Sequence, residues 1–271
     1  MSRITEAFSR ARRERRAAFI PFITAGDPSP DLTVPICEAL ARAGADIVEL
    51  GVPFSDPLAD GPTIQRASQR ALEQGVGLKR SLEIAALIRS RLDVALVLFT
   101  YCNPVLRMGV DRFARLASEA GIDGVLVTDL PLEEGGDLRA ELIVAGIDPI
   151  LLAAPTSGPE RVAAAGREGR GFIYYISRTG VTGARGTLPE GLAEEIREVR
   201  RAVPLPVAVG FGISTAEQVL MVSQAADGVV VGSALVAVID SALESGVEPR
   251  AIPALVEDRA RGLSTRREGG P

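Results

Sequence analysis

The sequence predicts an α/β protein, a closed (β/α)8 TIM barrel with an extra N-terminal helix and extra helices in its loops. Three observations predict it. Eight short runs rich in Val, Ile and Leu recur along 271 residues, stretches of helical periodicity separate them, and no shift in composition marks a second domain. Nearly continuous apolar strands that alternate with helices are typical of a parallel sheet covered by helices. Eight such units favour a closed barrel over the alternative, a doubly wound open sheet.

The expected strands are the apolar runs at residues 18–26, 45–51, 94–101, 124–129, 149–154, 171–177, 206–212 and 228–233. A leading helix over 4–17 should turn Phe8 and Ala11 inward, and a trailing helix should cover 252–263. We therefore expect residues 1–263 to form one domain. Residues 264–271 should be a disordered tail, because STRREGGP offers nothing to bury.

The net charge of −5 disfavours nucleic acid and anionic membranes as partners, because both would repel the average surface. No apolar run approaches the roughly 20 residues of a membrane span. The first residues also lack the apolar core of a signal peptide. We expect a cytoplasmic protein that acts on small molecules or binds protein.

Missing residue types narrow the chemistry. The chain has no histidine, which excludes Ser-His-Asp and Cys-His catalysis and the histidine ligands of most catalytic zinc sites. Cys37 and Cys102 lack metal-binding spacing and are interpreted as packing residues, and we expect no metal. The single lysine, Lys79, lies at the polar start of a helix, whereas a Schiff-base aldolase needs a buried lysine. The remaining candidates for catalytic groups are carboxylates, Tyr, Cys, Arg and the backbone.

Glu49 is the odd residue in the apolar strand ADIVELG. Active sites of such barrels form at the carboxyl ends of the strands. Strand alternation places Glu49 on the same face as Ile47 and Gly51, with Val48 and Leu50 toward the helices. A carboxylate inside the barrel loses hydration, which raises its pKa toward the range useful for proton transfer. The alternative is an ion pair with an arginine at the barrel rim.

A long loop, VPFSDPLADGPTIQ, follows that strand and carries Asp56 and Asp60. Position alone is weak support for a catalytic role of these two residues, because Asp is a common turn former and helix cap. Asp27 and Asp129 follow other strands and carry the same ambiguity.

Glycine-rich loops follow the last three strands: SRTGVTGARG at 177–186, GFGIS at 210–214 and GSA at 232–234. Backbone N–H groups and a helix N-terminus at this place predict a phosphate site, although tight turns alone also need glycine. A site that binds a phosphorylated substrate and has one or two catalytic carboxylates, but no metal, is compatible with two classes of reaction. One is an isomerisation, and the other is a carbon–carbon cleavage in which the substrate itself stores the electron pair.

The motifs PFITAGDP, ELGVPFSDPLADGPTIQ, GVLVTDLP, SRTGVTGAR and GFGIS occur in this order and resemble the tryptophan synthase alpha subunit family over residues 1–262. The eleven-residue stretch PFSDPLADGPT is the most specific. The resemblance implies a lyase of tryptophan biosynthesis that cleaves indole-3-glycerol phosphate to indole and glyceraldehyde 3-phosphate. It also implies a beta-subunit partner in an αββα complex. Pyridoxal phosphate is then expected only in that partner, and no cofactor in this chain.

The resemblance assigns Glu49 as general acid/base and Asp60 as the carboxylate that stabilises the protonated indole. It implies a mobile sixth loop that closes over substrate. Asp56, Asn103, Asp129 and Pro131 would face the beta subunit. The implied substrate-binding residues, whose apolar members could equally be core, are Phe22, Phe99, Tyr101, Leu126, Tyr174, Thr182, Gly183, Gly212, Gly232 and Ser233.

Two rivals remain at this point. A barrel isomerase of another phosphorylated amino-acid precursor would share the glycine phosphate site. It would need an acid and a base on opposite sides, and the DVGGG-like or CGG-like strand ends of such enzymes are absent. A binding-only paralogue could keep the barrel without turnover, but the intact Glu49 and Asp60 argue against it.

Overall fold

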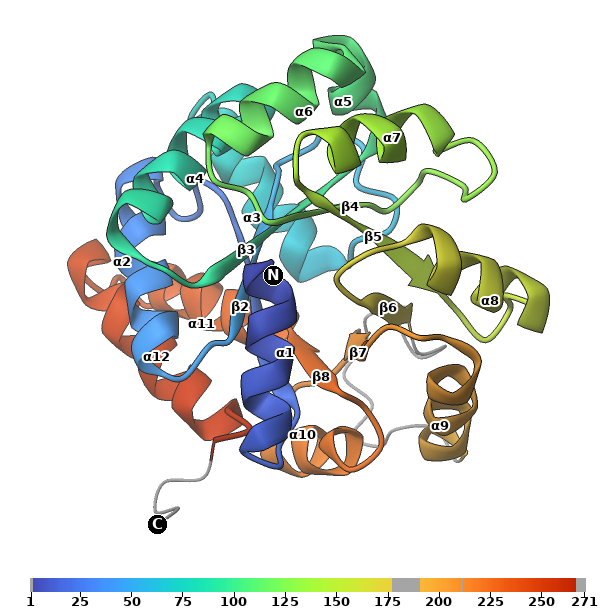
Figure 1. Ribbon diagram of the computed structural model, residues 1–271. Helices are drawn as coiled ribbons and strands as arrows, with labels where there is room; N and C mark the ends of the chain where they lie inside the picture. Colours follow the sequence, from blue (N-terminus) through green and yellow to red (C-terminus); the bar gives the residue numbers. More distant parts are fainter. Residues whose placement is uncertain (1, 177–190, 211, 267–271) are drawn as a thin grey trace.

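The computed structural model describes residues 2–176, 191–210 and 212–266, which form a closed barrel of eight parallel strands (Figure 1). The strands pair in sequence order, and the first closes against the last with Ala18 opposite Gly228. This closed barrel confirms the predicted fold and excludes the open sheet. The strands are β1 (Ala18–Thr24), β2 (Ile47–Gly51), β3 (Ala95–Thr100), β4 (Gly124–Val127), β5 (Asp148–Ala153), β6 (Ile173–Ile176), β7 (Val207–Gly210) and β8 (Gly228–Val231).

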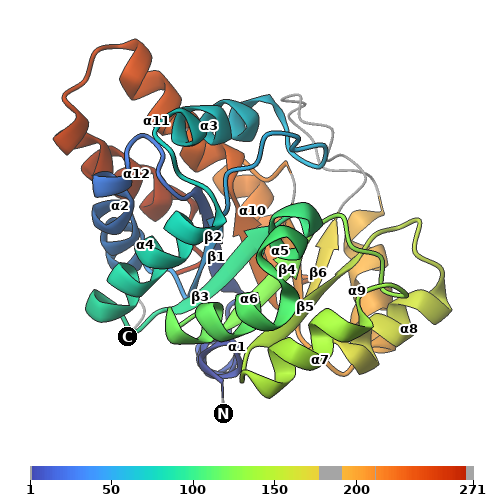
Figure 2. The ribbon, with the colours of Figure 1, turned by 90° about the horizontal axis from the view of Figure 1, so that it is seen from above.

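An outer ring of helices surrounds the strands (Figures 1 and 2). In the described residues two connections carry two helices each, those between β2 and β3 and between β3 and β4, and these are the predicted extra helices. The ring consists of α2 (Pro30–Arg42), α3 (Pro62–Glu73), α4 (Leu78–Arg91), α5 (Cys102–Met108), α6 (Val110–Glu119), α7 (Gly136–Val144), α8 (Pro159–Glu168), α9 (Leu192–Ala202), α10 (Ala216–Ser223), α11 (Ser233–Glu244), the 3-10 turn Pro249–Ala251 and α12 (Ile252–Leu263). None of the helices in the described ranges is long and apolar enough to cross a membrane.

Strand alternation divides the core into two clusters. Val48 and Leu50 belong to the cluster between strands and helices, whereas Ile47 and Val97 belong to the cluster inside the barrel. This is the arrangement that the period of two in β2 predicts. Glu49 follows Ile47 by two residues and therefore shares the inner face.

A helix before the first strand, α1 (Arg3–Arg13), crosses the barrel end where the strands begin (Figure 2). Its apolar face is buried in the inner cluster, and the ring of Phe8 lies 5.4 Å from that of Phe172. The predicted inward positions of Phe8 and Ala11 are confirmed. The helix ends before residue 17, because the backbone turns at Arg15, whose φ is 53°.

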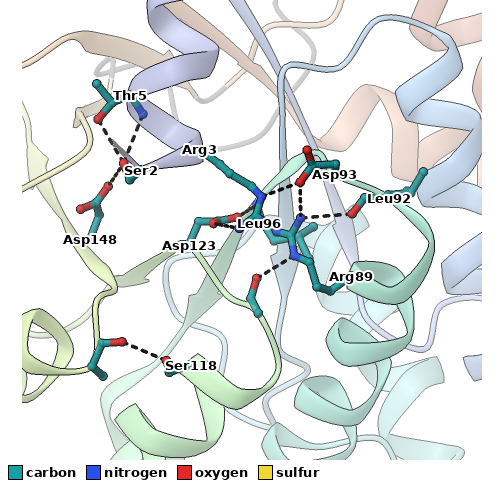
Figure 3. Close-up of polar contacts among 12 residues, drawn as sticks. Ser2, Arg3, Thr5, Arg89, Leu92, Asp93, Leu96, Ser118, Asp123 and Asp148 are labelled. Atoms are coloured by element: carbon teal, nitrogen blue, oxygen red, sulfur yellow. Dashed lines mark hydrogen bonds and ion pairs between the residues drawn. The ribbon is translucent and has the colours of Figure 1, made fainter.

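Polar contacts also hold α1 at this end of the barrel (Figure 3). Ser2 caps the helix and donates to Asp148 at 2.7 Å. Arg3 donates to Asp123 at 3.2 Å, and Asp123 in turn accepts the backbone N–H of Leu96 at 2.8 Å. The site must therefore lie at the opposite end, where the strands finish.

The start of the predicted tail lies against the barrel. The Thr265 hydroxyl donates to the carbonyl of Ala17 at 2.8 Å. Residues 267–271 lie outside the described ranges, so disorder of the tail stays a prediction.

Candidate active site

A cavity of about 520 Å³, a volume that includes space open to solvent, lies at the carboxyl end of the barrel. Strands β1, β3, β6 and β8 and the loops after β2, β7 and β8 supply its walls. Its mostly apolar walls with a few polar groups are typical of a small-molecule site. The lining residues are Phe22, Asp60, Gly61, Ile64, Phe99, Tyr174, Gly212, Ile213, Val230, Gly232 and Ser233.

Glu49 is fully buried beside this cavity, in register with Phe22 on β1 and Val97 on β3. Among the described residues, neither carboxylate oxygen has a hydrogen-bond partner. No arginine of that part of the chain pairs with it, so the rim ion pair is not what the structure contains. Burial raises the pKa of Glu49 to about 8, so the side chain is mostly protonated at neutral pH.

Glu49 is not itself one of the residues that line the cavity. Three aromatic rings of the cavity wall contact one another: the Phe22 ring packs edge-on against Phe99 at 5.3 Å, and the rings of Phe99 and Tyr174 lie 6.5 Å apart. Burial, and then the nearby Glu49 and Asp60, raise the pKa of Tyr174. Glu49 is therefore electrostatically coupled to the cavity wall.

Asp60 borders the cavity from the loop after β2 and is partly buried. Burial raises its pKa to about 6, while the Tyr101 hydroxyl, which donates to Oδ2 at 2.9 Å, acts to lower it. The same hydroxyl accepts the N–H of Ala59 at 3.2 Å, and the Tyr101 ring lies 5.0 Å from that of Phe54. Tyr101 thus fixes both the carboxylate and the loop that carries it.

The other end of the cavity is built from backbone. Gly212 has a φ of 79°, a conformation that strains other residues. Helix α11 begins at Ser233; the N–H of Leu235 bonds to the carbonyl of Gly232, whereas the N–H groups of Ser233 and Ala234 have no partner within the helix. Because these groups attract anions, this end suits a phosphate, as the sequence predicted. The cavity therefore has a carboxylate end and an anion-accepting end.

Comparison with known proteins agrees with this arrangement. Residues 8–256 match the family described as Tryptophan synthase alpha chain. This chain belongs to that family. The tryptophan synthase alpha chain of Solibacter usitatus is 48% identical over 266 residues, which cover 98% of this chain and 100% of that protein. The relative from Geobacter sp. is 52% identical over 87% of this chain and 88% of its own.

Solved structures of the tryptophan synthase alpha family share the fold. The alpha subunit from Legionella pneumophila superposes with a TM-score of 0.87 at 36% identity, covering 97% of this chain and 98% of its own. A chain of Mycobacterium tuberculosis tryptophan synthase gives a TM-score of 0.85 at 40% identity, with 97% and 98% covered.

The structure brings together most of the binding residues that the resemblance to the tryptophan synthase alpha family implied. Phe22, Phe99, Tyr174, Gly212, Gly232 and Ser233 all line the cavity. Tyr101 lies behind Asp60, and Leu126 is fully buried in the inner cluster rather than in the lining. Thr182 and Gly183, with the predicted sixth loop, lie outside the described residues.

The four residues expected to face a partner lie outside the cavity. Asp56 and Asn103 are exposed and share a groove at the same end of the barrel. Asp129 is exposed and accepts the N–H of Cys102 at 2.6 Å, which ties it to the start of α5. Pro131 is exposed but does not line the groove. Their role toward a partner remains a prediction.

Sequence reasoning missed Gly61, Ile64, Ile213 and Val230 as lining residues. Val230 could have been found, because it alternates with Gly228 and Gly232 along β8 and so shares their inner face. Nothing in the sequence indicated that Ile64, on the first turn of α3, would reach the cavity. In the described part of the chain no cluster of Cys, Asp or Glu side chains has the form of a metal site.

Proposed function

We propose that this chain cleaves indole-3-glycerol phosphate to indole and glyceraldehyde 3-phosphate, with Glu49 and Asp60 as its catalytic residues. As a tryptophan synthase alpha chain it is a lyase of tryptophan biosynthesis. The observation that carries the catalytic assignment is the buried Glu49, unpartnered among the described residues, beneath an apolar cavity that ends at a helix N-terminus. That combination suits a substrate with an aromatic end and a phosphate end.

The aromatic end of the substrate would lie among Phe22, Phe99 and Tyr174, which offer an apolar surface for an indole ring. Asp60, with its pKa at about 6, is mostly ionised at neutral pH. It can accept the indole N–H in a hydrogen bond. That bond strengthens as positive charge develops on the ring, so it stabilises the transition state more than the ground state.

Glu49 would carry the protons. In its protonated form it donates to carbon 3 of the indole ring, which leaves the ring positively charged beside Asp60. The resulting Glu49 carboxylate then accepts the proton of the adjacent side-chain hydroxyl. The carbon–carbon bond breaks, its electron pair restores the aromatic ring, and the aldehyde leaves. Glu49 ends protonated, as it began.

The phosphate would bind at Gly212, Gly232 and Ser233, where the first turn of α11 provides N–H donors and a favourable dipole. Thr182 and Gly183 of the sixth loop complete this part of the proposal on the strength of the family resemblance alone.

We extend the proposal to a beta-subunit partner in an αββα complex, with pyridoxal phosphate confined to that partner and a cytoplasmic location. One structural relative, with a TM-score of 0.83 at 38% identity over 91% of this chain and 97% of its own, comes from a study of the tryptophan synthase α2β2 complex of Pyrococcus furiosus. The groove that contains Asp56 and Asn103 is the expected contact, and Leu58 beside it is 95% exposed.

Incubating the purified chain with indole-3-glycerol phosphate, with and without a beta subunit, tests the proposal. We expect indole and glyceraldehyde 3-phosphate in equal amounts. An isomerase would instead consume its own phosphorylated substrate without producing indole, and a binding-only paralogue would bind the substrate unchanged. No indole above background in either condition would exclude the proposed reaction.

A further inference from the structure

Four charged side chains join the two helices whose first turns border the cavity. Helix α3 begins two residues after Asp60, and α11 begins at Ser233. The two helices are in contact and lie side by side in Figure 2. About one to two turns from the cavity, Arg66 and Arg70 of α3 approach Asp240 of α11, and Arg70 also reaches Asp27 in the loop after β1.

The four side chains form a continuous network. Arg70 binds Asp27 through two hydrogen bonds of 2.7 and 3.0 Å. The same guanidinium approaches Asp240 at 2.6 Å, and Arg66 donates to the other oxygen of Asp240 at 2.6 Å. Arg70 is thus hydrogen-bonded to Asp27 through one edge of its planar guanidinium, which fixes its orientation, and is in ionic contact with Asp240 through the other edge, although Oδ1 of Asp240 accepts no hydrogen bond among the described residues.

Burial distinguishes this network from the ion pairs of the surface. The side chain of Asp27 is fully buried, that of Asp240 is 7% exposed and that of Arg70 is 25% exposed. Exposed pairs contribute little, because water and salt screen them and their side chains move. A buried carboxylate that loses its partner is costly, so Arg70 cannot easily leave the position between Asp27 and Asp240.

A second set of contacts holds the far end of α3. The side-chain amide of Gln74, which follows the helix, donates to the carbonyl of Pro28 at 2.7 Å. Gly26, in the same loop after β1, packs so closely on Val76 that an added Cβ would lie 2.6 Å from a methyl carbon. Helix α3 is thus held to the loop after β1 at its end and to α11 along its side.

We propose that Asp27, Arg66, Arg70 and Asp240 are positioning residues that set the spacing between the two ends of the active site. The network fixes α3, which follows Asp60, relative to α11, whose start accepts the phosphate. This inference rests on the proposed function, since it needs a substrate that spans both ends. A ligand whose two ends bind at two sites binds more tightly than either end alone only when the distance between the two sites matches the length of the ligand.

The test compares the affinities of ligands that contact one end of the cavity with the affinity of a ligand that contacts both ends. Inorganic phosphate contacts only the α11 end, indole contacts only the Asp60 end, and an indole joined to phosphate by a three-carbon chain contacts both. In Asp240→Asn and in Arg66→Gln, we expect dissociation constants for phosphate and indole to stay close to those of the unmodified chain. In Asp240→Asn the spanning ligand should weaken by on the order of tenfold or more, with a matching loss of kcat/KM, and in Arg66→Gln, whose side chain is 53% exposed, by a smaller factor in the same direction.

Arg42→Gln is the matched control. Arg42 and Glu257 also join two helices, α2 and α12, through an ion pair of 2.7 Å, but neither helix supplies a cavity residue. This variant should bind all three ligands as the unmodified chain does. If Asp240→Asn fails to fold, Arg66→Gln still carries the test, because the Arg66 side chain is 53% exposed and its loss leaves the Arg70 pairs intact.

The positioning role would be overturned if the two variants lost all three ligands in parallel, or if the spanning ligand bound them as tightly as the unmodified chain. Failure of the proposed function looks different. In that case the unmodified chain would release no indole from indole-3-glycerol phosphate, whatever the variants bind.

Discussion

Tyr101 donates its hydroxyl proton to Asp60 across 2.9 Å, although 41 residues separate the two in the sequence. Tyr101 directly follows β3, so a side chain at the end of one strand holds the carboxylate that the loop after another strand carries. The bond favours the ionised form of Asp60 against the burial that opposes it.

Replacing Tyr101 by Phe should therefore raise the pKa of Asp60 above about 6 and free the loop at Ala59. Because the proposed reaction needs ionised Asp60, the acid limb of the pH profile of kcat/KM should move to higher pH. At pH 7 we expect a loss of about tenfold, the value of one hydrogen bond to a charged group. An acid limb that stays in place would show that Tyr101 does not control Asp60.

Glu49→Gln should remove the proton carrier while keeping the size of the side chain. We expect kcat to fall by roughly 10²- to 10⁴-fold, the usual contribution of general acid–base catalysis. Affinity for the spanning indole–phosphate ligand should change little, since neither of its ends depends on the charge of Glu49. Single-turnover kinetics and calorimetric titration measure the two quantities separately. Retained turnover would exclude Glu49 as the acid/base.

The same variant should be more stable than the unmodified chain in alkali. Burial holds the pKa of Glu49 at about 8 in the folded chain, against an ordinary value of 4.5. Folding therefore takes up a proton between these two pH values, and the free energy of unfolding falls as pH rises through that window. Glutamine does not titrate, so the variant does not lose this stability as the pH rises.

The stability advantage of Glu49→Gln should thus be small near pH 5, grow toward pH 8 and stay constant above it. Its size should be on the order of a few kcal/mol. Urea unfolding of both proteins at pH 5 and pH 9 measures it. If the variant and the unmodified chain had the same urea midpoint at pH 5 and again at pH 9, the Glu49 carboxylate would be hydrated in the folded chain.

Asp46→Asn should reduce stability without touching the cavity. Burial acts to raise the pKa of Asp46, but Arg16, the backbone N–H of Phe19 at 2.9 Å and Arg10 outweigh it, so the pKa is lowered. A lowered folded pKa contributes stability above the ordinary value of 3.8, and that stability is lost as pH falls through the folded pKa.

We expect the Asp46→Asn variant to lose about 3 kcal/mol at pH 7, because the partly buried Arg16 loses its buried carboxylate partner and keeps only Glu14, whose side chain is 45% exposed. The difference should shrink in urea titrations repeated below pH 4. Folded Asp46→Asn protein should keep its turnover, since Asp46 lies just before β2, at the end of the barrel away from the cavity. A variant that folds normally but is inactive would contradict this.

The strand pattern could be read from the sequence because parallel barrel strands are buried on both faces and stand out as apolar runs. The strand that carries Glu49 also has a period of two, so its inward direction followed from position. That Glu49 has no partner among the described residues could not be predicted, because pairing depends on which arginines of distant segments come close. Its raised pKa follows from that isolation.

The contacts that assemble the site could not be predicted from the sequence. Arg66 and Arg70 are one helical turn apart, a visible spacing, but their partner Asp240 is more than 160 residues away. Asp60 was ambiguous by position, since a capping or turn-forming Asp occurs in the same context. Family motifs singled it out, and the bond from Tyr101 supplies a physical reason that neither spacing nor composition contains.

Within the described part of the chain, helix α1 closes the end of the barrel where the strands begin, because Ile4, Ala7, Phe8 and Ala11 are buried there. The cavity that Asp60 and Ser233 line lies at the other end. We therefore expect the phosphorylated substrate to arrive, and indole to leave, at that other end. A protein docked over that end would control both steps without altering any catalytic group.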